Sequence, residues 1–314
     1  MLAKSEFDKY FQNLPQVNKE KDFDEFWNNS ITELKKTPID PLYKKKQISN
    51  TLFDTFDVTF NGFRKTLIRG ELHIPRDIRK PKVVITIPDY NRKYIYQQYP
   101  LNTNLAFFFL QLRGHEIINN TERNKEEMPG YITENILSKD NYYVKNIYLD
   151  ACRSIDALRL NRKLDCSSIG IIGKGLGAAA SLFMAAFSKK VAAVVLDTPA
   201  FCHLQLNQNI SKSDATKEIN DYLSNNKSKK NQIKINLSYF DSINLAENVR
   251  CPVLTTVGFK DTLSPPECIF ALFNHLLCEK TMEIYPDQGN EAGGEDQFIK
   301  SINWLYDIME NHNQ

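Results

Sequence analysis

The sequence has no long hydrophobic run, no excess of charge of one sign and no paired cysteines. No stretch approaches the roughly 20 apolar residues of a membrane-spanning helix, so we expect no membrane contact. Its 314 residues include 40 Lys and Arg against 38 Asp and Glu, a net charge of +2. This balance argues against nucleic-acid binding, which needs a basic face. The six cysteines form no C-x-x-C pair, which argues against a metal site or a disulfide framework.

The composition that remains is that of a globular protein. Hydrophobic residues make up 42% of the chain, enough to bury a core and too many for a disordered protein. The first residues, Met1–Asp8, carry charges where a secretory signal has its apolar segment. We therefore expect a cytoplasmic protein.

Residues 1–50 differ in character from residues 51–314. The first segment is polar with spaced aromatic residues, and Asp22–Trp27 combines acids with apolar residues at helical spacing. It is interpreted as an N-terminal helical arm ahead of the main domain. Alternating residues in Thr55–Phe60, followed by Arg64–Ile74, predict a hairpin that enters a sheet.

After Pro81, short apolar runs alternate with helix-like stretches. The predicted buried strands are Val83–Ile87, Leu105–Leu112, Ile169–Ile172, Val191–Leu196, Val253–Val257 and Met282–Tyr285. The predicted helices are Val144–Leu160, Leu176–Phe187, Glu267–Leu277 and Gln297–Met309. The alternation predicts an α/β fold with a mostly parallel sheet and helices on both faces. Residues 204–236, which contain a helix-like Ala215–Leu223, are interpreted as an exposed polar excursion over the sheet's edge.

A glycine-rich turn joins a predicted strand and helix between Ile169 and Ala180. One chemistry with this shape is the nucleophile elbow G-x-S-x-G, which lifts a serine above the sheet. The other is the dinucleotide fingerprint G-x-G-x-x-G/A, which Gly173, Gly175 and Ala178 satisfy, with Asp197 ending the next strand. Against the second, the fingerprint usually opens its domain on the first strand.

Ordered blocks along nearly the whole chain favour the elbow. They are Asp22–Trp27, Phe56–Pro75, Pro88–Asn91, Arg113–Gly114, Tyr142–Arg153, Thr198–Cys202, Tyr239–Ala246, Cys251–Val253, Gly258–Asp261 and Pro265–Pro266. In this order they resemble the acetyl xylan esterase/cephalosporin-C deacetylase family of α/β hydrolases, which has a Gly-Tyr turn where this chain has Asp89-Tyr90. The resemblance implies the α/β-hydrolase fold, a homo-oligomer, and hydrolysis of acetyl esters on sugars and related small molecules.

The sequence departs from the family at two catalytic positions. The family elbow reads Gly-x-Ser-Gln-Gly-Gly, and Gly175 stands at the position of the nucleophilic serine. The acid position holds Asp261, whereas the histidine position holds Asn290. The resemblance also implies an oxyanion hole made by the backbone amides of Tyr90 and Leu176.

No other histidine is a convincing base. The five histidines are His73, His115, His203, His275 and His312. In this fold the base follows the acid in the chain, and only His275 and His312 follow Asp261. The first lies in a predicted helix and the second is two residues from the end of the sequence. The positions of His115 and His203 are more typical of a surface and a packing residue.

No other nucleophile is convincing. Lys174 is protonated at neutral pH unless it is buried, and it is interpreted as an exposed charge near a helix start. Ser167 and Ser168 precede the strand and cannot reach the carboxyl end of the sheet.

The sequence therefore predicts a catalytically degenerate family member. It would keep a pocket for a small molecule or an acetylated sugar without efficient ester hydrolysis, and without a metal or cofactor. Two alternatives stay open: an active carbohydrate or small-ester deacetylase with an unrecognised catalytic group, and a dinucleotide-binding protein.

Overall fold

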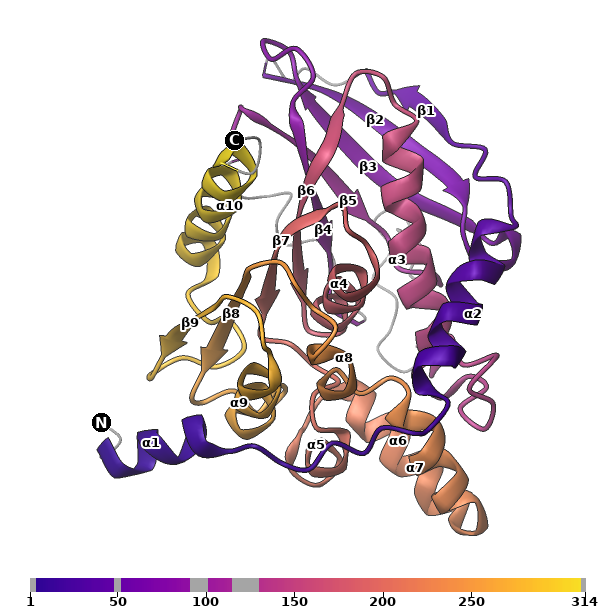
Figure 1. Ribbon diagram of the computed structural model, residues 1–314, viewed down its shortest axis with the longest axis vertical. Coiled ribbons are helices and arrows are strands. Elements are labelled where there is room, and N and C mark those ends of the chain that lie inside the picture. The colour runs from indigo at the N-terminus through magenta and orange to yellow at the C-terminus, as the bar shows by residue number, and fades with distance from the viewer. Residues whose placement is uncertain (1–3, 48–51, 91–100, 115–129, 312–314) are drawn as a thin grey trace.

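A computed structural model describes residues 4–47, 52–90, 101–114 and 130–311 of the chain (Figure 1). The strands of this described part form one nine-stranded sheet in the order β1-β2-β3-β5-β4-β6-β7-β8-β9. The pairs β1/β2, β2/β3 and β3/β5 are antiparallel, and all later pairs are parallel. The strands are β1 (Leu42–Lys45), β2 (Phe53–Asn61), β3 (Leu67–Pro75), β4 (Lys82–Ile87), β5 (Leu105–Leu110), β6 (Asp165–Lys174), β7 (Val191–Asp197), β8 (Val253–Gly258) and β9 (Lys280–Tyr285).

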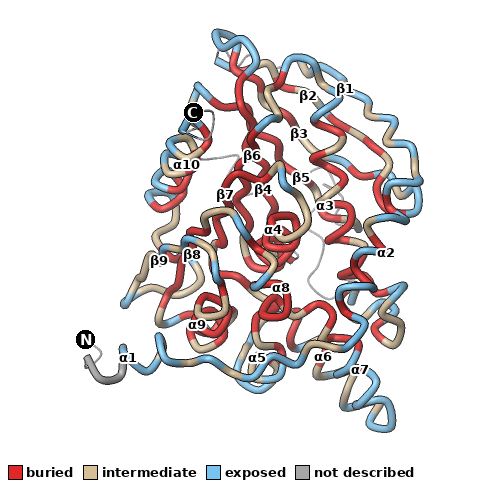
Figure 2. The backbone as a smooth tube through the Cα atoms, in the orientation of Figure 1, coloured by how far each residue is buried: buried red, intermediate tan, exposed pale blue. Residues whose placement is uncertain are grey.

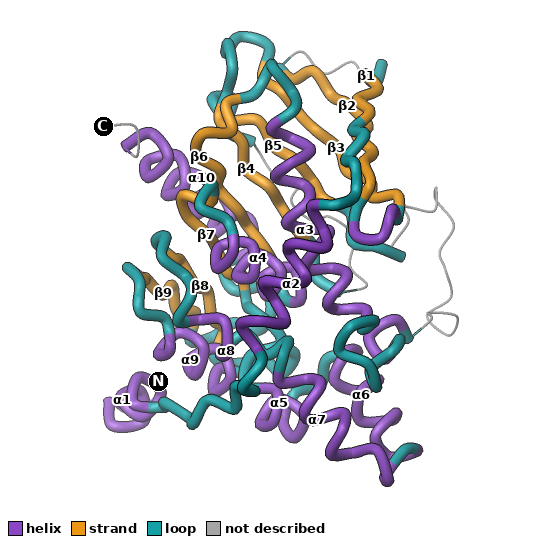
Figure 3. Tube along the Cα trace, turned by 45° about the vertical axis from the view of Figure 1, so that its right-hand side comes forward, coloured by secondary structure: helices purple, strands orange, loops and turns teal. Residues whose placement is uncertain are grey.

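The sheet separates two apolar layers, as an α/β fold requires. Along β4, Val83 and Ile85 belong to one buried cluster and Val84 to the other, because successive side chains point to opposite faces. Helices α3 (Tyr143–Arg159) and α4 (Leu176–Phe187) cover the first face. Helix α10 (Gly294–Asn311) covers the second (Figure 3). The central strands and α4 form the buried interior (Figure 2). The predicted fold class is thus confirmed.

Two details of the predicted sheet are wrong. The first is β9, predicted to be buried on both faces; it is half-exposed because it is the edge strand and has a neighbour on one side only. The second is β1, which lies within the arm predicted to be helical and pairs with β2. The hydrophobic pattern of a sequence does not show which strand lies at the edge of a sheet, and a strand of four residues is too short to show a clear period.

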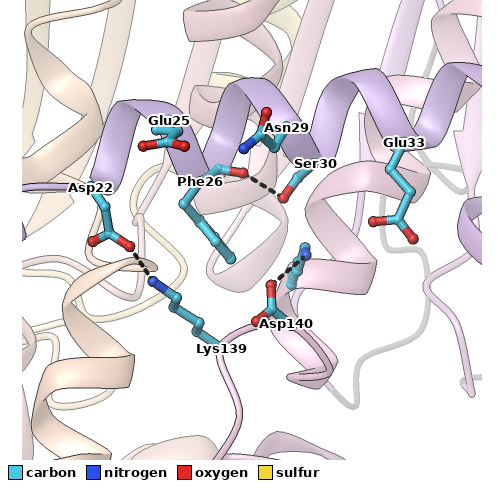
Figure 4. A pocket seen from close by; sticks show the side chains of 9 residues that line it. Asp22, Glu25, Phe26, Asn29, Ser30, Glu33, Lys139 and Asp140 are labelled. Atoms are coloured by element: carbon cyan, nitrogen blue, oxygen red, sulfur yellow. Dashed lines mark hydrogen bonds and ion pairs between the residues drawn. The ribbon is translucent and has the colours of Figure 1, made fainter.

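The N-terminal arm packs against the main domain. It contains α1 (Lys4–Gln12) and α2 (Phe23–Lys35). The Trp27 side chain of α2 is fully buried, and its Nε1 donates a hydrogen bond of 3.1 Å to the Tyr239 carbonyl. A cavity of about 240 Å³ separates α2 from residues 139–145, and Lys139 pairs with Asp22 across it (Figure 4).

The segment 204–236 is mostly helical. It holds α5 (Leu204–Ile210), α6 (Asp214–Asn225) and most of α7 (Lys230–Ser238), so the predicted helix at Ala215–Leu223 is confirmed. The interpretation as an exposed excursion is wrong for the faces that bury Ile219 and Ile233. These helices lie below the carboxyl ends of the parallel strands (Figure 1). The remaining helices are α8 (Ile243–Ala246) and α9 (Pro266–His275). None of the helices in the described ranges has the length and apolarity to cross a membrane.

Candidate active site

The glycine-rich turn forms a sharp elbow between β6 and α4. Gly175 has φ +54° and ψ −118°, a conformation that glycine adopts without steric penalty. Neighbouring glycines allow close packing: a Cβ atom on Gly177 would lie 2.3 Å from the Ile87 carbonyl oxygen, and one on Gly173 would lie 2.3 Å from that of Gly177. This packing accounts for the glycine spacing without a bound phosphate.

The carboxylate of Asp89 occupies the space above the elbow. Its Oδ1 accepts hydrogen bonds from the backbone amides of Tyr90 at 2.7 Å and Leu176 at 2.8 Å. These are the two amides predicted to form the oxyanion hole, and they converge on one oxygen. A Cβ atom with ideal geometry on Gly175 would lie 1.9 Å from that oxygen. One of the chain's own side chains thus occupies the predicted oxyanion hole.

Sequence reasoning did not assign a role to Asp89. The signal was present, because the family has glycine where this chain has a charged residue. The role of Asp89 becomes clear only in the structure, where the loop after β4 contacts the elbow after β6. These strands are parallel neighbours, so their carboxyl ends lie side by side.

Asp261 and Asn290 lie in contact, as their family positions imply. Asp261 follows β8, and its Oδ1 accepts from the amides of Leu263 at 2.7 Å and Ser264 at 3.0 Å. Its Oδ2 accepts from Nδ2 of Asn290 at 3.1 Å. Burial raises the pKa of Asp261, and these hydrogen bonds partly oppose that rise. The amide of Asn290 replaces a base geometrically but cannot take up a proton.

Lys174 extends the hydrogen-bond network of Asp261 and Asn290. Its Nζ donates to the Asn290 carbonyl at 2.7 Å, to Asp197 at 3.0 Å and to Thr198 at 3.2 Å. The prediction of an exposed charge is therefore wrong: the side chain is 12% exposed and fully paired. Asp197 also accepts from the hydroxyl of Thr256 at 2.8 Å, so the candidate ribose-binding acid is engaged within the protein.

No imidazole reaches Asp261 in the described part of the chain. His203 precedes α5 in a left-handed conformation, and burial lowers its pKa. His275 ends α9, and its Nδ1 lies 2.7 Å from the Ala271 carbonyl. His73 contacts Glu71. His115 and His312 lie outside the described residues. Ser167 and Ser168 lie within the first half of β6 and not before the strand as predicted, and they are still remote from its carboxyl end.

Tyr90 joins the elbow region to the segment 204–236. Its hydroxyl donates to the Glu218 carboxylate at 3.0 and 3.1 Å, and burial raises the pKa of Glu218. Helix α6 thus contributes to the wall beside the predicted oxyanion hole. The described residues contain no group of three or more His, Cys, Asp or Glu that could hold a metal ion.

Comparisons with known proteins agree with this architecture. An acetyl esterase, Axe7A of Xylanibacter ruminicola, is 26% identical over 93% of this chain and 68% of its own length. The acetyl xylan esterase from Paenibacillus sp. R4 superposes with a TM-score of 0.87 at 24% identity, covering 98% of this chain and 99% of that one. Acetyl xylan esterase 1 from Thermoanaerobacterium sp. JW/SL YS485 superposes with a TM-score of 0.80 at 24% identity, covering 95% and 98%.

The solved structures establish the α/β-hydrolase fold, and the family follows from the sequence match. The model of the acetyl xylan esterase family matches residues 3–308. This chain is therefore a member of the acetyl xylan esterase family.

Proposed function

We propose that this family member is catalytically degenerate: it keeps the carboxylic ester hydrolase fold and lacks efficient ester hydrolysis. The observation that carries the proposal is the Asp89 carboxylate on the amides of Tyr90 and Leu176. Those donors stabilise the negative charge of a tetrahedral intermediate only when its oxygen can reach them. In this chain the carboxylate of Asp89 already occupies the position of that oxygen.

The two other parts of the reaction centre support the same conclusion. Gly175 supplies no hydroxyl, and Asn290 supplies no proton acceptor next to Asp261. Loss of the serine or the histidine from a working triad lowers turnover by about a millionfold. This corresponds to about 8 kcal/mol of barrier. An occupied oxyanion hole removes the residual catalysis that such variants retain.

The role we propose is binding without turnover. The ligand would be a small molecule or an acetylated sugar, held among the loops beyond the carboxyl ends of the strands. The protein would serve as a binding or regulatory protein, or as a subunit of a mixed assembly. The resemblance to the family implies a homo-oligomer. A cytoplasmic location stays a prediction.

An active deacetylase is the second candidate. Family membership, the name of the Xylanibacter ruminicola relative, and the retention of Asp261 favour it. It requires both a nucleophile other than residue 175 and a displacement of Asp89 from the two amides.

Acetate release separates the two candidates. We expect the purified chain to hydrolyse p-nitrophenyl acetate and acetylated xylo-oligosaccharides no faster than an Asp261→Asn variant, and to form no acyl-enzyme by mass spectrometry. The variant is the control for contaminating esterases. Rapid acetate release that Asp261→Asn abolishes, or an acyl group on a side chain, would overturn the proposal.

A further inference from the structure

A cavity lined by basic residues, called the basic cavity below, lies at the end of the sheet opposite to the elbow. It has a volume of about 410 Å³ and is lined by Asp54, Phe56, Ile74, Pro75, Arg76, Ile78, Arg79, Lys80, Arg162 and Lys163. Lys80 precedes β4, and Arg162 and Lys163 precede β6, so the cavity is at the amino ends of these parallel strands. The candidate catalytic positions follow the carboxyl ends.

The charges around the basic cavity are unbalanced. The carboxylate of Asp54 is engaged by Lys45 at 2.9 Å and by Arg76 at 3.0 Å. Within the described part of the chain, the other four lining cations form no ion pair; they are Arg79, Lys80, Arg162 and Lys163. Holding like charges on one concave surface costs free energy that a bound anion offsets.

The acids of the rim offset only part of this charge. The two segments at the rim, residues 75–81 and 160–165, contain Asp77 and Asp165. Asp77 does not line the cavity. Asp165 accepts hydrogen bonds from the amide and the hydroxyl of Ser167, and its charge also interacts with that of Lys80, so Arg79, Arg162 and Lys163 carry the excess.

The floor of the basic cavity is apolar. Ile74 and Pro75 are buried, whereas Ile78 is 37% exposed. The Phe56 ring lies beside them, with the ammonium group of Lys163 5.6 Å from its centroid. A ligand that fits this surface has an anionic end for the cations and an apolar or planar end for the floor.

We propose that the basic cavity binds a small organic phosphate with two or more phosphoryl groups, of the chemical class of a nucleoside diphosphate. Guanidinium groups match phosphate oxygens with two parallel hydrogen bonds, which assigns the phosphates to Arg79 and Arg162. The base and sugar lie against Ile78 and Phe56. The cavity volume is within the range of small-molecule sites. This proposal is independent of whether the elbow hydrolyses esters.

Titration calorimetry with ADP and the full chain tests the proposal. In about 50 mM salt, where screening is weak, we expect saturable binding with one site per chain. The Arg79→Gln/Arg162→Gln variant should bind at least about tenfold more weakly, since it loses charge-assisted hydrogen bonds. A Lys234→Gln variant removes an exposed charge on α7 and should bind like the wild type.

Pyrophosphate distinguishes the two ends of the ligand. An Ile78→Ser variant should weaken ADP binding and leave pyrophosphate binding unchanged, because only the nucleoside contacts the floor. The proposal is overturned if no binding of ADP is detected at about 1 mM, because a Kd above that concentration corresponds to less than about 4 kcal/mol of binding free energy. Equal binding to the double variant, or tighter binding of a long polyanion such as heparin with no defined stoichiometry, also overturns it.

Discussion

The carboxylate of Asp89 occupies the place that a side chain on Gly175 would take. Oδ1 of Asp89 lies 2.8 Å from the Leu176 amide and 1.9 Å from the ideal position of a Cβ atom on Gly175. The absence of a side chain at residue 175 therefore permits the carboxylate to bind the amides. The two features are coupled, so a serine introduced at residue 175 clashes as long as Asp89 is present.

The first prediction is that Gly175→Ser destabilises the protein and gives no esterase activity. The backbone at φ +54° costs a serine about 1–3 kcal/mol, and the new Cβ atom clashes with Oδ1 of Asp89, which distorts the hydrogen bonds of that carboxylate without freeing the two amides. We expect a loss of more than about 3 kcal/mol in the free energy of unfolding, because two charge-assisted hydrogen bonds are weakened as well. Denaturant titration measures it.

Gly294→Ser is the matched control for this variant. Gly294 has nearly the same φ, +52°, but nothing lies within 4 Å of a Cβ atom placed on it. It isolates the backbone strain from the clash with Asp89. If the two serine variants are equally stable, Asp89 does not hold the position described here.

The second prediction concerns reconstruction of activity. Asp89→Gly/Gly175→Ser/Asn290→His should release acetate from p-nitrophenyl acetate, since it restores the nucleophile and the base and empties the oxyanion hole. Gly175→Ser/Asn290→His should remain at least about a hundredfold slower, the cost of losing one oxyanion-hole donor. Equal rates for the double and triple variants would show that Asp89 does not block the hole. No activity in a folded triple variant would count against an inherited reaction centre.

The contact between Asp261 and Asn290 could be predicted, whereas the position of Asp89 could not. The first depends on loops after neighbouring strands β8 and β9, whose family positions are readable from the residues between Gly258 and Asn290. The second depends on the χ angles of one aspartate and on two backbone amides. A sequence shows that a charge is present but not which donors it meets.

Lys174 illustrates the same limit at the level of burial. In the sequence it stands alone in a glycine-rich turn, which is typical of an exposed residue. Its partners are Asp197 at the end of β7, Thr198 just after it and Asn290 after β9, each more than 20 residues away. By contrast, the strands β4, β5, β7 and β8 could be predicted well, because burial on both faces makes them largely apolar, whereas only the apolar part of β6 could be recognised.

The third prediction is a pH dependence of stability from Asp241. Burial raises its pKa to about 6, although its carboxylate accepts three backbone hydrogen bonds, from His203, Leu204 and Ile243. Between pH 4 and 6 the unfolded chain has released this proton and the folded chain has kept it. The free energy of unfolding therefore falls by up to about 3 kcal/mol as pH rises through this window, and this contribution is constant above it.

An Asp241→Asn variant isolates that contribution. Other groups titrate in the same range, including His203, whose lowered pKa acts in the opposite direction. The difference in unfolding free energy between wild type and variant, measured by urea titration from pH 4 to 7, removes them. A difference that does not change with pH would contradict an elevated pKa at Asp241.

The fourth prediction concerns the ion pair of Arg113 and Asp150, two residues from separate blocks of the resemblance. Asp150 is 4% exposed, and its carboxylate accepts from Arg113 at 2.8 and 2.9 Å and from the Phe63 amide at 2.7 Å. Arg113→Leu should cost about 3–5 kcal/mol in the free energy of unfolding at pH 7, because it leaves a buried carboxylate without its cation.

Neutralising the carboxylate should recover part of that loss. Arg113→Leu/Asp150→Asn keeps an acceptor for the Phe63 amide and removes the buried charge, so it should be more stable than Arg113→Leu alone. The single variant should also approach wild-type stability as pH falls toward 4, since burial raises the pKa of Asp150 and its protonation then removes the penalty. If the deficit is the same at both pH values and in the double variant, lost packing of the Arg113 side chain explains it, and the charge does not.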